Sequence, residues 1–174
     1  MSEARLYREE TTLRDGTPVV FRAVRPDDKQ RIREAFHHLE AETIYTRFFA
    51  SRTDVTEEEL SEGVDVDFVR NVTLVATLPA DETVIGAGRY MGIGDSREAE
   101  VAFTVEEDYH GQGIASRLLS ILAGLARGNG FERFHAEVLP RNAGMLRVFE
   151  RSGLPMTRCR DEETVHVTLE LGPR

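Results

Sequence analysis

The stretch Val101-Ala-Phe-Thr-Val-Glu-Glu-Asp-Tyr-His-Gly-Gln-Gly-Ile-Ala-Ser116 determines how the rest of the sequence is interpreted. Its first five residues predict a strand, and from Gly113 onward the apolar period changes from two to about 3.6, which predicts a helix. A strand, a glycine-bearing loop and a helix start aim consecutive main-chain N–H groups at one point. This arrangement favours a bound phosphate or pyrophosphate without requiring a basic side chain.

Composition restricts the classes of function. The chain has 174 residues and a net charge of −9, with 40% apolar and 30% charged residues, so we expect one folded domain spanning 1–174. The acidic balance argues against nucleic-acid binding, and no apolar run is long enough for a membrane span. Because Cys159 is the only cysteine, we expect no internal disulfide and no cysteine-based metal site. The N-terminal residues lack an apolar signal core, so we expect a cytoplasmic protein.

The remaining sequence predicts a mixed α/β (α+β) fold with a mainly antiparallel central sheet and helices on both faces. Asp15-Gly16 marks a hairpin, and Thr56 with Glu59 forms a capping box. The expected elements are helices over 26–39 and 41–49 and from 56, strands over 71–77, 83–91 and 98–105, a helix from 113, a strand over 133–139, a helix over 142–151, and one or two closing strands within 156–169.

The glycine loop alone leaves several interpretations open. A P-loop requires GxxxxGK[ST], which the sequence lacks. A dinucleotide-binding loop requires a third glycine, where this chain has Ser116, and an acidic residue after the following strand, whereas Glu132 precedes it. A structural turn that binds nothing is the remaining alternative.

Residues from about 10 to 170 resemble the GNAT superfamily of N-acetyltransferases. His110-Gly-Gln-Gly-Ile-Ala115 is similar to the family motif Q/R-x-x-G-x-G/A, although His110 departs from the usual Gln or Arg. Leu139-Pro-Arg-Asn-Ala-Gly-Met-Leu146 resembles the second cofactor segment, in which Asn142 matches an Asn that contacts the coenzyme A arm. The resemblance implies acetyl-CoA as cosubstrate, no metal, and a cofactor site made of Phe103, Thr104, Val105, His110, Gly111, Gln112, Gly113, Ile114, Ala115, Ser116 and Asn142.

A narrower resemblance concerns the acetyltransferase domain of Pat-type bacterial protein lysine acetyltransferases. The similar segments are Leu13-Arg-Asp-Gly-Thr-Pro-Val19, Arg25-Pro-Asp-Asp28, Tyr45-Thr-Arg-Phe-Phe49, Val64-Asp-Val-Asp67 and Glu100-Val-Ala-Phe103. It implies a lysine side chain as acceptor, and a splayed central strand near Phe103 to Val105 that frees main-chain N–H groups for the thioester.

Glu100 is the candidate general base. Transfer to an amine requires removal of a proton from an ammonium whose reference pKa is about 10.4, and a nearby carboxylate can accept it. Period two places Glu100, Ala102 and Thr104 on one strand face. Pat-type enzymes carry such a Glu on the matching strand, whereas the plain alternative is a solvent-facing residue like its neighbour Glu98. Many relatives have a Tyr as general acid at the position of Phe149, so we assign no general acid.

Three functions stay open from the sequence. The leading one is acetyl transfer from acetyl-CoA to a protein lysine. A second keeps acetyl-CoA and changes the acceptor to a small amine or amino acid. A third is a coenzyme A-binding sensor or interaction module without turnover. The acidic residues Glu57, Glu58, Glu59, Glu62, Asp65 and Asp67 are a candidate surface for attracting a lysine-bearing protein. The sequence leaves the oligomeric state open, a homodimer included.

Overall fold

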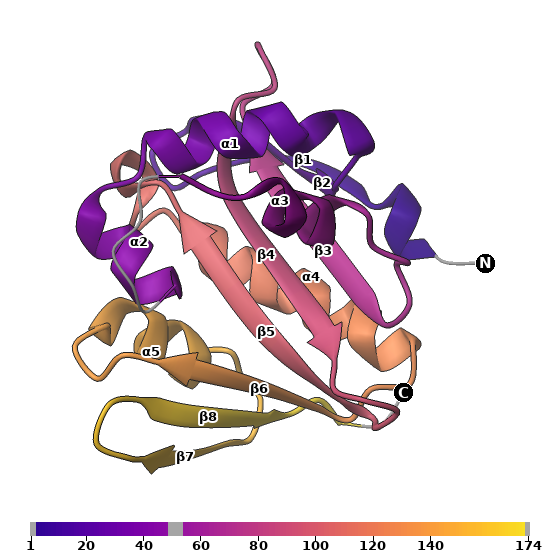
Figure 1. Ribbon diagram of the computed structural model, residues 1–174, viewed down its shortest axis with the longest axis vertical. Helices are drawn as coiled ribbons and strands as arrows, with labels where there is room; N and C mark the ends of the chain where they lie inside the picture. Colours follow the sequence, from indigo (N-terminus) through magenta and orange to yellow (C-terminus); the bar gives the residue numbers. More distant parts are fainter. Residues whose placement is uncertain (1–2, 49–53, 173–174) are drawn as a thin grey trace.

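The computed structural model describes residues 3–48 and 54–172 and arranges them around one eight-stranded sheet (Figure 1). The strands are β1 (Arg8–Thr12), β2 (Pro18–Ala23), β3 (Asn71–Thr77), β4 (Val84–Gly92), β5 (Glu98–Val105), β6 (Arg133–Val138), β7 (Met156–Arg160) and β8 (Val165–Glu170). The helices are α1 (Lys29–His37), α2 (Ala41–Phe48), α3 (Glu57–Val64), α4 (Ile114–Gly128) and α5 (Ala143–Glu150), with short 3₁₀ helices η1 (Glu3–Leu6), η2 (Pro26–Asp28) and η3 (Glu107–Tyr109). Within the described ranges, no helix is long and apolar enough to cross a membrane.

The strand order confirms the predicted mixed, mainly antiparallel sheet. Strands β1 to β5 pair antiparallel in sequence order, beginning with the hairpin that turns at Gly16. Strand β6 is parallel to β5, and β8 pairs with β6 while β7 lies at the edge. The sequence left the closing segment as one or two strands, and the structure has two. The last strand, β8, lies between β6 and β7 in the sheet.

The pairing between β5 and β6 is short. It joins Glu98 with Arg133, Ala99 with Phe134 and Glu100 with His135, and it ends there. On its other edge β5 remains paired with β4 up to Val105. Beyond Glu100 the two parallel strands therefore diverge, and Figure 1 shows the widening gap between them. This gap positions the candidate site.

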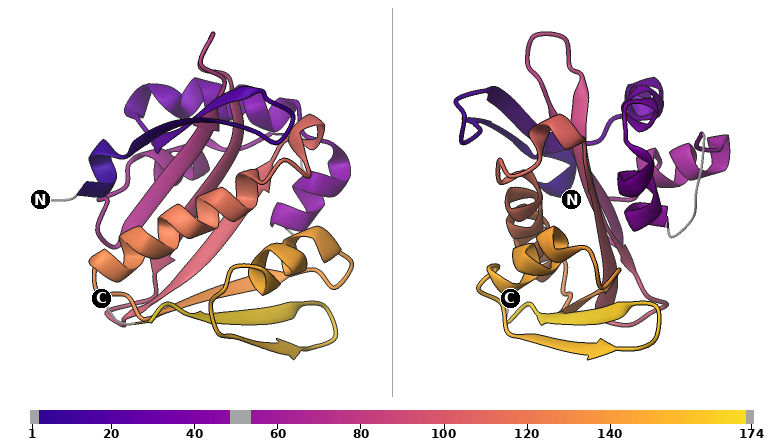
Figure 2. Two further views of the ribbon diagram at one scale, coloured as in Figure 1. Left: turned by 180° about the vertical axis from the view of Figure 1, so that it is seen from behind. Right: turned by 90° about the vertical axis from the view of Figure 1, so that its left-hand side faces the viewer.

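Helices α4 and α5 cover one face of the sheet, and α1, α2 and α3 cover part of the other (Figure 2). Helix α4 packs closely because β4 carries glycines beneath it. A Cβ atom on Gly86 would stand 3.0 Å from Ile114 Cγ2, and one on Gly88 would stand 3.3 Å from Leu122 Cδ1, both in α4. On the opposite face, α3 begins at the predicted capping box, in which Thr56 Oγ1 accepts the Glu59 N–H at 3.1 Å.

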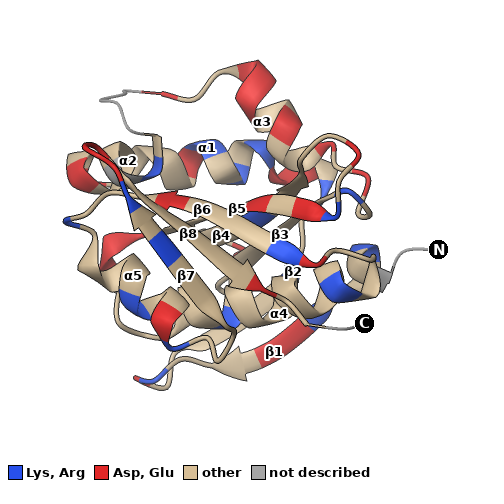
Figure 3. Cartoon of the chain, turned by 90° about the horizontal axis from the view of Figure 1, so that it is seen from below, with Lys and Arg blue, Asp and Glu red and all other residues tan. Residues whose placement is uncertain are grey.

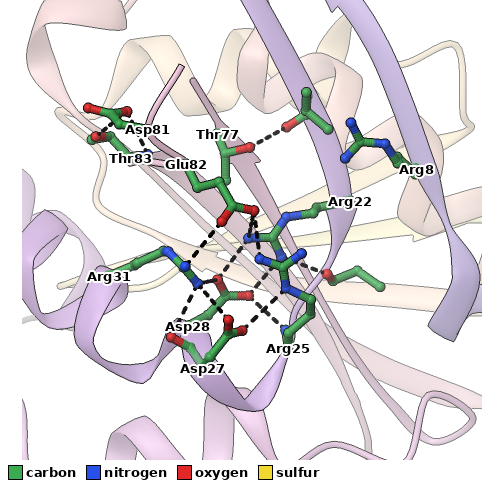
Figure 4. A network of polar contacts seen from close by, with 12 residues as sticks. Arg8, Arg22, Arg25, Asp27, Asp28, Arg31, Thr77, Asp81, Glu82 and Thr83 are labelled. Carbon is green, nitrogen blue, oxygen red and sulfur yellow. Dashed lines mark hydrogen bonds and ion pairs between the residues drawn. The ribbon is translucent and has the colours of Figure 1, made fainter. Parts of the chain in front are cut away.

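A buried ion pair attaches the start of α1 to the sheet (Figure 4). Arg22 Nη1 and Nη2 each lie 2.8 Å from an oxygen of the Asp28 carboxylate, and these residues are 4% and 0% exposed. Asp28 also accepts the Arg25 N–H at 2.7 Å and Arg31 Nη1 at 3.0 Å. Burial alone raises the pKa of the Asp28 carboxyl, but these hydrogen bonds outweigh it, so its pKa lies below the ordinary value.

Asp28→Ala should cost about 3–5 kcal/mol of unfolding free energy, because it removes the two-bond partner of the buried Arg22 and leaves only the Glu82 carboxylate, 3.9 Å away. Denaturant unfolding followed by circular dichroism measures this cost. Asp27→Ala is the matched control, since Asp27 is exposed and its ion pairs with Arg25 and Arg31 should contribute at most about 1 kcal/mol. Equal losses for the two variants would contradict the assignment.

The same carboxyl predicts the direction of a pH effect. Because the folded-state pKa of Asp28 is depressed, its contribution is complete above the unfolded value of about 3.9 and is lost as the pH falls through the folded-state pKa. The stability difference between the parent and Asp28→Ala should therefore shrink below about pH 4. A difference that grows on acidification would contradict this sign.

Candidate active site

The loop between β5 and α4 presents main-chain N–H groups at a helix start. Gly111 and Gly113 have φ values of +77° and +89°, in the left-handed region that favours glycine. Gly113 is the N-cap of α4, so the N–H groups of Ile114, Ala115 and Ser116 have no acceptor within the helix. Together with the positive end of the helix dipole, these groups form a site for a phosphate oxygen.

Three contacts fix the shape of this loop. His110 Nε2 donates to the Val105 carbonyl at 2.7 Å, since a carbonyl only accepts. Arg14, in the β1–β2 hairpin, donates from Nη1 to the Gly111 carbonyl at 3.1 Å. Gln112 Oε1 accepts the Asp15 N–H at 3.1 Å. Contacts between segments 97 residues apart thus hold the loop, and the unusual His110 anchors it to the end of β5.

A cleft of about 310 Å³ lies between this loop, the end of β5 and α5. Nearly all the residues predicted for the cofactor line it, namely Phe103, Thr104, Val105, His110, Gly111, Gly113, Ile114, Ala115, Ser116 and Asn142. Gln112 is the exception, because its side chain is directed to the hairpin.

The gap exposes the main chain of β5 to the cleft. His110 reaches the Val105 carbonyl on the edge of β5 that does not face β4, and the Glu106 N–H is bonded to Ile85 on the β4 side. Because N–H and C=O groups alternate between the two edges along a strand, the N–H groups of Phe103 and Val105 point into the gap. They are the donors available to a carbonyl bound there.

Helix α5 closes the other side of the cleft. Asn142 Oδ1 accepts the Met145 N–H at 3.2 Å and caps the helix, which leaves the Asn142 amide nitrogen for a ligand. Phe149 is 1% exposed and packs edge-on against Phe103, with ring centroids 6.2 Å apart. Phe149 therefore fills the core beneath the cleft and offers no proton.

Basic residues that sequence reasoning did not identify also line the cleft. Arg14, Arg147 and Arg151 all contribute to its wall. Within the described ranges none of the three forms an ion pair with a carboxylate, although the chain carries a net charge of −9. Unpaired guanidiniums beside a helix N-terminus suit a ligand with several phosphates. The spacing of Arg147 and Arg151, four residues apart on one helix face, was the signal available in the sequence.

Glu100 lies on the opposite face of β5, outside the cofactor cleft. It is exposed and lines a hollow of about 370 Å³ together with Glu98, His135, Glu137 and His166. Its carboxylate forms no hydrogen bond or ion pair with the described residues. Thr104, further along the same strand face, lines both the cofactor cleft and a cavity beneath α1–α3, so the two sides of the sheet adjoin at β5.

Two other carboxyl groups, those of Glu98 and Glu106, have surroundings that differ from those of Glu100. Glu98 Oε1 lies 2.5 Å from His135 Nε2, and this hydrogen bond holds the pKa of the Glu98 carboxyl below its ordinary value. Glu106 lines the cavity beneath α1–α3, and burial raises the pKa of its carboxyl. Sequence reasoning weighed Glu98 but missed Glu106, because burial of that side chain depends on helices distant in sequence.

Comparison with known proteins gives consistent matches. Residues 33–154 match the model of the acetyltransferase (GNAT) family. The chain is 35% identical over 147 residues to acetyltransferase Pat of Mycolicibacterium smegmatis, covering 84% of this chain and only 44% of that protein. The crystal structure of the GNAT domain of S. lividans PAT matches with a TM-score of 0.86 and 33% identity, over 94% of this chain and 96% of that one. The yncA protein of Salmonella typhimurium, solved with its cofactor acetyl-CoA, shares the fold with a TM-score of 0.73 and 19% identity, over 90% and 95% of the two chains.

Gly113→Asp should weaken acetyl-CoA binding at least about tenfold, because a side chain and a negative charge would face the phosphate site. Isothermal titration calorimetry measures the affinity. Gly130→Asp is the matched control: Gly130 also has a left-handed φ, +91°, with open space around it, but it lies at the other end of α4. The control should lose stability and keep its affinity, whereas equal affinity for both variants would contradict the phosphate site.

Proposed function

Because this chain belongs to the acetyltransferase (GNAT) family and is an acyl-CoA-dependent N-acetyltransferase, we propose that its acceptor is a protein lysine and that Glu100 is the general base. The observation that carries the proposal is the position of Glu100. Its unpaired carboxylate stands where β5 and β6 part, beside the gap that exposes Phe103 and Val105 to the cofactor cleft.

The cleft accounts for how acetyl-CoA is held. The N–H groups from Gly111 to Ser116 bind the pyrophosphate, and Arg14, Arg147 and Arg151 balance the remaining phosphate charge. The N–H groups of Phe103 and Val105 bind the extended arm and polarise the thioester carbonyl, which acetyl-CoA supplies as the acyl donor. The arm then lies along β5 in the gap and directs the acetyl group toward Glu100.

Glu100 makes the acceptor nucleophilic. It takes a proton from the lysine ammonium, directly or through water, and the neutral amine attacks the thioester carbonyl. The N–C bond forms and the C–S bond breaks. Of the two protons that the ammonium loses on becoming an amide N–H, the first is on Glu100, and the second passes from the attacking nitrogen through water to the solvent or to the departing thiolate. A thiol with a reference pKa of about 8.5 is acidic enough to leave without a protein acid, consistent with Phe149 in place of a proton donor.

The surface around Glu100 suits a cationic protein segment. Helices α1, α2 and α3 leave this face of β6, β8 and β7 uncovered (Figures 1 and 2). The hollow there contains the carboxylates of Glu98, Glu100 and Glu137. The acidic residues of α3 border the same side of the sheet (Figure 3). An open acidic surface admits a lysine on a folded partner, whereas a small amine requires an enclosed site.

Glu100→Gln should lower the turnover rate about 100- to 10,000-fold near neutral pH while acetyl-CoA affinity stays unchanged. Steady-state release of coenzyme A and calorimetry measure the two quantities. Glu98→Gln is the matched control two residues away on the same strand face and should retain most activity. If Glu100→Gln keeps the parent rate and Glu106→Gln loses it, the base is Glu106, and our assignment is wrong.

The acceptor class is tested separately with a panel of lysine-containing proteins, lysine peptides, free amino acids and small amines. We expect the highest kcat/KM for a protein or peptide lysine, because the hollow around Glu100 is open. A preference of tenfold or more for a free amine would favour the small-molecule alternative. Acetyl-CoA binding without transfer to any acceptor would favour the non-catalytic binding module.

A further inference from the structure

A second cavity, of about 260 Å³, lies between the sheet and the layer formed by α1, α2 and α3. Its walls are mostly apolar and include Ile32, Phe36, Leu39, Phe48, Leu60 and Val84. Two guanidiniums enter this apolar space, those of Arg47 from α2 and Arg89 from β4. The cavity adjoins the cofactor cleft at Thr104, so a group bound in it lies beside the reacting centre.

The two guanidiniums have no anionic partner among the described residues. Neither Arg47 nor Arg89 has a carboxylate oxygen within 4.0 Å or a side-chain hydrogen bond there. Burial, and then the like charge of Arg89, lower the pKa of Arg47 to about 10, so it remains cationic at neutral pH. Charged groups withdrawn from water without a partner are costly, and they mark a place where an anion binds.

An unpaired hydroxyl completes the donor set. Thr73 is 4% exposed, lines the same cavity, and its Oγ1 has no hydrogen-bond partner. Thr73 pairs with Arg89 across β3 and β4, and Arg89 pairs with Ala102 across β4 and β5. Thr73, Arg89 and Ala102 therefore form a row on one sheet face. Ala102, at the end of this row, is two residues from Glu100 along β5. Along a strand this spacing is about 6.5–7 Å, which a substrate carrying both an amine and an anion can span.

Acidic residues offset the charge of this set only in part: the charges of Glu100 and Glu59 raise the pKa of Arg47, but burial and the like charge of Arg89 lower it by more. Glu59 accepts the Thr56 N–H at 2.9 Å in the cap of α3 and has a further interaction of its own. Glu62 is exposed at the rim. Burial raises the pKa of Glu106, so the cavity disfavours its charged form. None of the three forms an ion pair with Arg47 or Arg89 in the described part of the chain.

We infer that this cavity binds a carboxylate carried by the substrate, held by Arg47, Arg89 and Thr73 Oγ1, while the amine is presented to Glu100. This inference rests on the proposed function. The carboxylate has two possible sources, which share their chemistry: an acidic residue near the acceptor lysine, or the free end of a dicarboxylic acyl group such as succinyl on coenzyme A. Paired guanidiniums with a neighbouring hydroxyl suit a planar carboxylate because both of its oxygens can be bound.

Two substrate pairs distinguish the sources. In the acceptor arm, acetyl-CoA is used with a lysine peptide that contains glutamate near the lysine and with the same peptide containing glutamine instead. In the acyl arm, one neutral peptide is used with succinyl-CoA and with butyryl-CoA. The parent should prefer the carboxylate member of one pair by roughly tenfold to a hundredfold in kcat/KM.

Arg89→Gln, Arg47→Gln and Thr73→Val should each reduce that preference ratio, and Arg89→Lys should restore part of it. The matched control is Arg158→Gln. Arg158 lies on the exposed edge strand β7 and pairs with Glu150 of α5, so this change should leave the ratio and the activity unchanged. A parent ratio near one in both arms would overturn the inference, and so would arginine variants that keep the parent ratio.

A binding measurement separates this inference from the proposed function. Glutarate and its neutral diamide are titrated into the parent and into Arg89→Gln while nuclear magnetic resonance follows the arginine and Thr73 signals. Glutarate should bind the parent more tightly than the diamide and lose this advantage in the variant. If no acceptor is acetylated yet glutarate binds, only the proposed function fails; if glutarate shows no advantage, the carboxylate site is wrong.

Discussion

The early end of the pairing between β5 and β6 is the constraint on which the rest of the structure depends. Only three residue pairs join these parallel strands, and beyond Glu100 the main chain of β5 has no paired strand on that side. Helix α4 lies close against β4 over Gly86 and Gly88, and α5 inserts Phe149 against Phe103 beneath the gap. The main-chain N–H groups of β5 that face the gap lose their water when a ligand fills the cleft, and an extended acyl arm with amide groups replaces the lost hydrogen bonds.

Positive charge is concentrated at particular sites although the molecule as a whole is acidic. Although the net charge is −9, guanidiniums without carboxylate partners gather at two places, the cofactor cleft and the cavity under α1–α3. Elsewhere many arginines pair with acids, most completely where Arg22 meets Asp28 in the core, and others such as Arg70 and Arg127 bond main-chain carbonyls. The unpaired cations therefore indicate where substrates supply the missing charge. The acidic hollow around Glu100 has the opposite character and suits the cationic amine before its proton is removed.

Sequence patterns predicted the bounds of the strands better than they predicted which strands pair in the sheet. The strands over 71–77 and 98–105 have the expected bounds, because period two and turn residues act locally. The placement of β8 between β6 and β7 was not predictable, since pairing of short strands depends on distant packing. The glycine spacing of the loop predicted most of the residues that line the cleft, because glycines at these positions indicate a particular backbone conformation. Glu106, Arg47 and Arg89 were missed, because single charged residues carry no periodicity and their burial arises only in the folded chain.

The most direct measurement is a crystal structure with a conjugate in which lysine is linked to coenzyme A through an acetyl bridge. We expect the diphosphate on the N–H groups between Gly111 and Ser116 and the arm between β5 and β6. We also expect the lysine nitrogen within about 2.6–3.2 Å of the Glu100 carboxylate, or one water away. An arm bound outside that gap would contradict the site, and a nitrogen that contacts Glu106 while Glu100 faces solvent would contradict the assigned base.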